Sequence, residues 1–317
     1  VGAHRSMENP KLGMVIFAIS MLTNTFLNWV FIFGNLGAPA LGVEGAALAT
    51  LLSRTAEFVI MVTYALTNAR FRLKPALLLR PGSALLQKFV RYSGPVVLNE
   101  TLWGLGNSLY KVVMGHMEGS TELLAARALA GNMEDLCTVA IFAISGTTTI
   151  IIGREIGAGR REQVYEMGAA LNTMAMGCGL VIGLVLIGGA WWIFPGLVYP
   201  FFHLSSVSGG ITTMMLTFTG VFLPLRAFNT VNTVGVLRGG GDVRAATVID
   251  LLPLWLVALP LAAIFGLGVK WGIFWVYVGI MMESTTKFFL GVPRFRSRAW
   301  INDVTQFSHV KEGEPSL

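Results

Sequence analysis

Charged residues are scarce in this sequence. They make up 13% of its 317 residues, and only 17 side chains are acidic, whereas soluble domains carry about 25% charged residues. So few charges cannot cover a water-facing surface of ordinary size. The shortage therefore excludes an ordinary soluble domain and favours a protein that places much of its surface in lipid.

Cysteine and histidine are also too few for metal or disulfide chemistry. Cys137 and Cys178 both fall within apolar runs, and the four histidines lie far apart. This pattern lacks the spacing of a zinc site, so we expect the two cysteines to be small packing residues. No His-Glu-X-X-His sequence or serine–histidine pairing supports a membrane enzyme such as an intramembrane hydrolase. We expect neither an enzyme nor a cofactor.

Long apolar runs dominate what remains. Hydrophobic residues make up 54% of the chain and its mean hydropathy is +0.67, so we predict an all-α polytopic membrane protein. Pro224 and Pro260 lie inside two of the runs and predict kinks, because proline lacks the backbone donor. Eight runs are long enough to cross a bilayer, at residues 12–34, 45–66, 89–115, 125–153, 164–194, 211–236, 246–267 and 271–291.

The basic residues between these runs predict the orientation. The net charge of +6 does not indicate nucleic acid, because lysine and arginine lie in short blocks between apolar runs. The opposite ends of the runs carry only Lys111, Arg127 and Lys270. By the positive-inside rule we expect a cell-membrane protein with both chain ends in the cytoplasm. The basic blocks lie at residues 1–11, 67–91, 154–161, 238–244 and from 287 onward.

The longest basic loop suggests a division into two bundles. Residues 67–88 include Arg70, Arg72, Lys74 and Arg80 but no acid. We interpret this segment as a cytoplasmic linker, although an ordinary basic loop on anionic lipid would look the same. Our predicted boundaries are 1–66 for two helices of a first lobe, 89–291 for a six-helix lobe and 292–317 for a cytoplasmic tail.

Glu100 is the leading candidate for function. It lies about 18 Å along a helix from Lys88, close to the middle of a hydrocarbon layer about 30 Å thick. An unpaired carboxylate at that depth faces a cavity and can exchange a proton near neutral pH, or it is a permanently neutral structural group.

Other polar residues surround Glu100 in the sequence. Trp103 and Asn107 follow on the same helical face. A carboxyl, an indole and an amide suit an organic cation, but they equally suit a polar seam between helices. Asn99 or Asn107 would add a hard oxygen ligand for Na⁺.

A second polar group includes Glu134, Arg226 and Asn229. A buried arginine needs a carboxylate, and Glu100, Glu134 and Asp250 are all candidates for Arg226. The arginine then serves either as a structural clamp or as a substrate contact. Asp250 also suits a position near the lipid headgroups. Two local pairs are predicted from spacing, namely Arg54 with Glu57 and Glu283 with Lys287.

Five segments resemble the multidrug and toxic compound extrusion (MATE) transporters. They are Asn9-Pro10-Lys11-Leu12 with IFGNLGAPALGVEGAALATLLSR, then SGPVVLNETLWGLGNSLY with its acidic Glu100, LAGNMEDL, IIGREIGAGRREQ and VGVLRGGGDVR. Each motif is loose, but their order is specific and covers the chain to about residue 296.

The resemblance implies helices five to twelve of a twelve-helix, two-lobe transporter. The chain starts at Val1 without methionine, and we expect an N-terminally truncated chain whose first four helices are missing. Where some members have a coupling aspartate in the tenth helix, this sequence has Arg226 and its neighbours, which puts more weight on Glu100.

The resemblance also implies an antiporter that exports lipophilic or cationic drugs in exchange for H⁺ or Na⁺. Its partners would be these small molecules and membrane lipids. A flippase of lipid-linked sugars is an alternative, although it would favour a more basic centre. An inert fragment of a transporter is another.

Overall fold

The computed structural model describes residues 10–67 and 83–302. The chain divides into two compact units, Val1–Gln87 and Lys88–Leu317. All regular structure in the described residues is helical, as predicted. The predicted linker lies mostly outside the described residues, and the next helix already begins at Ser83.

The first unit is a pair of helices, α2 (Pro10–Phe33) and α3 (Val43–Thr67), joined through the short 3₁₀ turn η1 (Asn35–Gly37). Gly45 brings the pair close, since a Cβ there would lie 2.4 Å from the Phe31 carbonyl oxygen. Ser20 donates a hydrogen bond to Glu57 at 3.0 Å. The predicted pair of Arg54 and Glu57 is confirmed at 2.7 Å.

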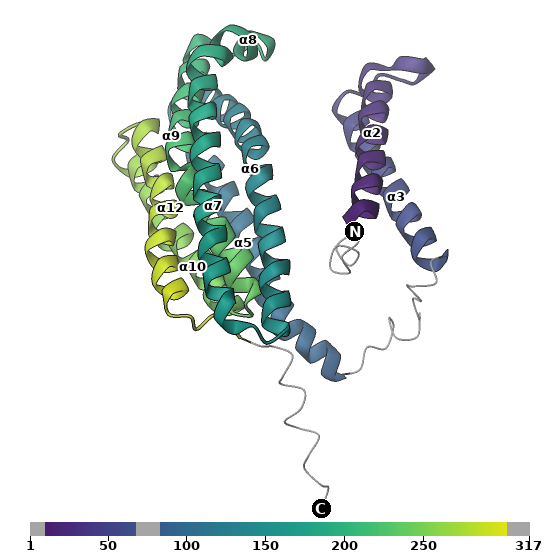
Figure 1. The fold of residues 1–317 in the computed structure, drawn as a ribbon. Helices are drawn as coiled ribbons and strands as arrows, with labels where there is room; N and C mark the ends of the chain where they lie inside the picture. Colours follow the sequence, from purple (N-terminus) through teal and green to yellow (C-terminus); the bar gives the residue numbers. More distant parts are fainter. Residues whose placement is uncertain (1–9, 68–82, 303–317) are drawn as a thin grey trace, which may run out of the picture. The chain divides into compact units, whose positions relative to one another are not determined.

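The second unit is a bundle of long helices (Figure 1). Three of its long runs combine α-helical and π-helical pieces. The elements in order are α5 (Ser83–Gly115), α6 (Ser120–Gly157), α7 (Arg161–Gly188), η2 (Gly189–Ile193), α8 (Phe194–Phe201), α9 (Ser206–Thr230), η3 (Val231–Leu237), α10 (Val243–Pro253), η4 (Leu254–Ala258), α11 (Leu259–Ala263), η5 (Ile264–Gly268) and α12 (Ile273–Arg296).

Taken as continuous helical runs, with each π-helical piece joined to its α-helical neighbours, these elements correspond one to one with the predicted apolar runs of this unit. Among the described residues, six helices are long and apolar enough to cross a membrane, against the eight crossings predicted. The two others, α5 with 33 residues and α12 with 24, are long enough to cross but are not apolar enough to be counted among the six. The all-α polytopic fold is confirmed, and crossing by α5 and α12 stays a prediction.

The π-helical pieces change the expectation about proline. Pro224 lies within α9, and the π-helical η3 begins only at Val231. Pro260 lies in the short α11, between the π-helical η4 and η5. The departures from α-helical bonding are thus spread over whole turns around Pro260, where we expected a single kink.

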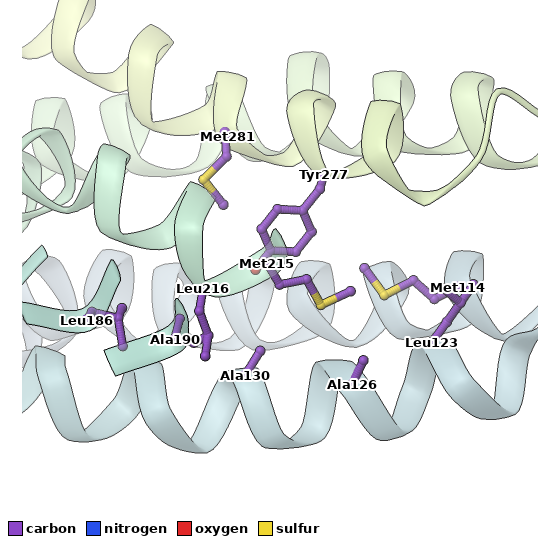
Figure 2. Packing of buried hydrophobic residues seen from close by; sticks show 10 residues of the cluster. All are labelled: Met114, Leu123, Ala126, Ala130, Leu186, Ala190, Met215, Leu216, Tyr277 and Met281. Atoms are coloured by element: carbon purple, nitrogen blue, oxygen red, sulfur yellow. The ribbon is translucent and has the colours of Figure 1, made fainter. Parts of the chain in front are cut away.

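Apolar side chains from five of these long runs meet in the core of the bundle. Figure 2 shows Met114 of α5, Leu123 of α6, Leu186 of α7, Met215 of α9 and Tyr277 of α12 converging. Each is 4% exposed or less. Cys137 packs against this core, and it and Cys178 are free thiols, as predicted.

The chain remains packed beyond residue 292, where we expected a tail. Helix α12 runs to Arg296, and the Trp300 side chain is fully buried. A Cβ at Gly240 would lie 2.4 Å from the Trp300 carbonyl oxygen, and the Asn302 amide donates to the Gly240 carbonyl at 2.9 Å. Residues up to Asn302 therefore belong to the bundle, because Gly240 leaves room for them.

Candidate functional site

Two groups of charged side chains lie inside the second unit. We call the first the Lys287 cluster, and it joins side chains of α5, α10 and α12 with the residue that follows η3. The second is the Glu134 cluster, which joins α6 and α9. The members of the Lys287 cluster are Asn99, Glu100, Tyr110, Arg238, Asp250, Glu283 and Lys287, and those of the Glu134 cluster are Arg127, Glu134 and Arg226.

The Lys287 ammonium is the centre of the first cluster. Its Nζ lies 2.6 Å from Asp250 Oδ1 and 2.8 Å from Glu283 Oε1, and its side chain is 9% exposed. The pair of Glu283 and Lys287 was predicted from spacing and is confirmed. The Asp250 side chain is 16% exposed and has basic partners, and its position near the headgroups stays a prediction.

Glu100 lies at the edge of this cluster and is paired. Its Oε1 accepts a hydrogen bond from Arg238 Nη1 at 3.0 Å. The expectation of an unpaired carboxylate is therefore wrong. Arg238 directly follows η3, so Glu100 lies within an arginine's reach of that helix end, and its depth in a membrane stays a prediction. The Glu100 side chain is 60% exposed and that of Arg238 is 11% exposed.

Asn99 turns away from the exposed side of Glu100 and into the bundle. It is 1% exposed and donates through Nδ2 to Asp250 Oδ2 at 2.8 Å. Sequence reasoning assigned it to a cavity wall, whereas its observed contact positions a buried carboxylate. Neighbouring residues on a helix point in directions about 100° apart, which explains why Asn99 and Glu100 differ so much in exposure.

Trp103 and Asn107 follow Glu100 along α5 but make mainly local contacts. The Asn107 amide donates to the Trp103 carbonyl at 2.9 Å, one turn back on the same helix. Trp103 is 40% exposed. Neither has a hydrogen bond or ion pair to the Lys287 cluster among the described residues, and a part in substrate binding stays a prediction.

The Glu134 cluster identifies the partner of Arg226. Glu134 forms an ion pair with Arg226 and a second one with Arg127, whose Nη1 lies 3.2 Å from Glu134 Oε2. Its side chain is 10% exposed. Of the three carboxylates proposed for Arg226, Glu134 is the partner, and Glu100 and Asp250 are not. Two arginines around one carboxylate satisfy its oxygens in a buried position.

Asn229 belongs to a helix crossing. It is 6% exposed, and its Nδ2 donates to the Ser284 carbonyl of α12 at 2.8 Å. This bond ties α9 to α12, and the prediction that Asn229 lines a cavity stays a prediction.

Sequence reasoning missed several members of these clusters. Arg127 was assigned to the outer ends of the runs, and Arg238 to a cytoplasmic loop. Tyr110, which donates to Glu283 at 3.1 Å, carried no signal at all. In these two clusters only the spacing of Glu283 and Lys287 was readable. Arg127 and Glu134 share α6 but lie seven residues apart, and the other partners come from different helices.

A separate cavity of about 570 Å³ lies at the other end of the unit. It is formed by the α5–α6 turn, the start of α9 and the turn from η5 to α12, and its rim carries His116, Glu118, Glu122 and Lys270. It contains none of the predicted site residues. Within the described residues, no three histidine, cysteine, aspartate or glutamate side chains gather closely enough to hold a metal ion.

Chemically, the Lys287 cluster is a relay of alternating charge. It runs from the exposed Glu100 through Arg238 and Asp250 to the buried Lys287 and Glu283. Charged groups are costly inside a membrane unless they are paired or serve transport. Glu100 is the member that combines a basic partner with an open side, so it can exchange that partner.

Comparison with known proteins identifies a family and several relatives of this chain. A family model described as MatE matches residues 95–264. The chain is 25% identical over 276 residues to a Bacillus subtilis protein named uncharacterized transporter YisQ, covering 86% of this chain and 58% of that protein. It is 23% identical over 296 residues to the probable multidrug resistance protein NorM of Thermotoga maritima, covering 93% and 62%.

Solved structures share the fold. An outward-facing multidrug resistance MATE family transporter of the MOP superfamily superposes with a TM-score of 0.75 at 21% identity, covering 92% of this chain and 63% of that one. An inward-facing conformation gives 0.71 at 21% identity, covering 92% and 65%. The chain thus spans about three fifths of the length of the relatives it matches.

Proposed function

We propose a transport function for this chain because it belongs to the multidrug and toxic compound extrusion (MATE) family. Relatives named NorM are described as probable multidrug resistance proteins. Membership supports a membrane transporter of drugs or toxins and argues against an enzyme. The finer statements that follow go beyond membership.

The chain belongs to a secondary antiporter that exports lipophilic or cationic compounds in exchange for H⁺ or Na⁺. The observation that carries this proposal is the pairing of Glu100, a 60% exposed carboxylate, with Arg238, which is 11% exposed. A carboxylate with one fixed basic neighbour and one open side can be neutralised alternately by a coupling ion and by a cationic substrate. Alternate neutralisation is what antiport requires.

A flippase of lipid-linked sugars receives no support from the charges. The two clusters hold four basic and four acidic side chains, whereas a pyrophosphate group calls for a basic excess. This balance favours a cationic or lipophilic substrate at the open carboxylate.

The test is efflux of a lipophilic cation from cells that lack other pumps, driven by an imposed H⁺ or Na⁺ gradient. The protein with Glu100→Gln should still bind the cation, with lower affinity, but should lose ion-driven efflux. Glu166→Gln removes an exposed carboxylate of α7 and serves as the matched control. Full ion-driven efflux by Glu100→Gln would make Glu100 structural and would shift attention to the Glu134 cluster.

A further inference from the structure

The Lys287 ammonium occupies a position between two carboxylates from different helices. Asp250 comes from α10, while Glu283 lies one turn before Lys287 on α12. One oxygen of each carboxylate lies within 2.8 Å of the Lys287 Nζ. All three side chains are 16% exposed or less. A compact cation is therefore enclosed by two carboxylate oxygens inside the bundle.

Groups other than Lys287 hold the two carboxylates in place. The second oxygen of Asp250 accepts from Asn99 at 2.8 Å, and the second oxygen of Glu283 accepts from Tyr110 at 3.1 Å. Asn99 and Tyr110 both belong to α5. The hydrogen bonds from Asn99 and Tyr110 thus orient the two carboxylates, so that their other oxygens face a cation whether or not it is the lysine ammonium.

A further buried oxygen belongs to Asn99, the side chain that contacts Asp250. Asn99 Oδ1 is buried and has no hydrogen-bond partner within the part of the chain that the structure describes. Carboxylate and amide oxygens are the ligands that hard cations accept. Arg238 Nη2, 3.8 Å from Asp250, is a second basic group beside these carboxylates, and Arg226 interacts electrostatically with Glu283.

We propose that Lys287 is a resident cation: its ammonium takes the place of a sodium ion between Asp250 and Glu283 and excludes Na⁺ from these carboxylates. Lys287 is then a residue that determines ion specificity. This inference rests on the proposed function for one consequence. If Na⁺ is excluded here, the coupling ion that this unit exchanges is the proton. The occupancy of the site is a separate matter and can be measured without transport.

Sodium binding to the purified protein in detergent tests the proposal. We would measure the thermal unfolding midpoint Tm in sodium chloride and in choline chloride at equal ionic strength. The wild-type protein should show equal Tm values in the two salts. Lys287→Met removes the ammonium at similar volume, and its Tm should rise by a few degrees in sodium and saturate, as expected for a bound ligand.

Two variants control this measurement. Lys287→Arg keeps a cation and should show no response specific to sodium. Lys287→Met combined with Asp250→Asn removes one of the two carboxylates and should lose the sodium response of Lys287→Met. If Lys287 were merely structural, Lys287→Met would lower the Tm equally in both salts, and neither control would differ in its response to sodium.

Several outcomes decide the matter. Stabilisation of the wild type by sodium that Asp250→Asn abolishes would overturn the proposal, as would a folded Lys287→Met protein without a sodium response. Recovery of folded Lys287→Met only in sodium buffers would support it, and failure to fold in either salt would count against it. Loss of efflux by the wild type would contradict the proposed function but would leave these binding results unchanged.

Discussion

At the scale of single residues, the structure divides the polar side chains into exposed and anchoring ones. Glu100 is open on one side, while its neighbour Asn99 is buried and positions Asp250. The sequence predicted that these residues mattered, but it could not predict their partners. Arg238 lies 138 positions from Glu100, and only the packing of separate helices brings the two together.

Asn229 provides a prediction about stability at this scale. Asn229→Ala removes the donor to the buried Ser284 carbonyl and should lower the free energy of unfolding by about 1 kcal/mol. Asn132→Ala is the matched control, since Asn132 is exposed on α6 and its loss should have little effect. Equal unfolding curves in detergent for both variants and the wild type would show that the bond contributes nothing.

At the scale of elements, helix positions were largely predictable and their internal irregularities were not. The apolar runs placed the ends of α6, and those of α9 with η3, to within five residues. The π-helical η3 follows Pro224 by a full turn and more, and its position depends on packing. The partner of Arg226 was unpredictable for the same reason, because three carboxylates on different helices were equally compatible with the sequence.

The crossing of α7 and α9 depends on glycine. A Cβ at Gly183 would lie 2.3 Å from the Gly220 carbonyl oxygen, whereas a Cβ at Gly177 of the same helix would meet no atom within 4 Å. Gly183→Ala should therefore force the helices apart and destabilise the protein by about 2 kcal/mol or more. Gly177→Ala should be neutral or slightly stabilising. Thermal unfolding in detergent compares the two, and equal midpoints would contradict the close crossing.

At the scale of the whole molecule, the distribution of basic residues predicts the topology. The turn before α9 and the turn between α6 and α7 lie at opposite ends of the crossing helices. Arg154, Arg160 and Arg161 mark the second turn as cytoplasmic. Basic residues far apart in the sequence thus predict a common side of the membrane. The sequence therefore supplies a testable orientation, whereas it did not predict the contacts between helices.

Cysteine labelling tests this topology. In a background without Cys137 and Cys178, a membrane-impermeant maleimide added outside should label Ser206→Cys and should leave Ala158→Cys unlabelled. Both positions are exposed, so access depends on the side of the membrane. Labelling of Ser206→Cys only after permeabilisation would reverse the orientation.

The most direct test of the central claim is proton counterflow during substrate transport. The purified protein would be reconstituted into liposomes containing a pH indicator, and a lipophilic cation would be added with and without sodium. The account predicts substrate-dependent proton movement by the wild type that does not need sodium and that Glu100→Gln abolishes while retaining weaker binding of the cation. Unchanged proton movement by Glu100→Gln, or movement that appears only with sodium, would contradict it.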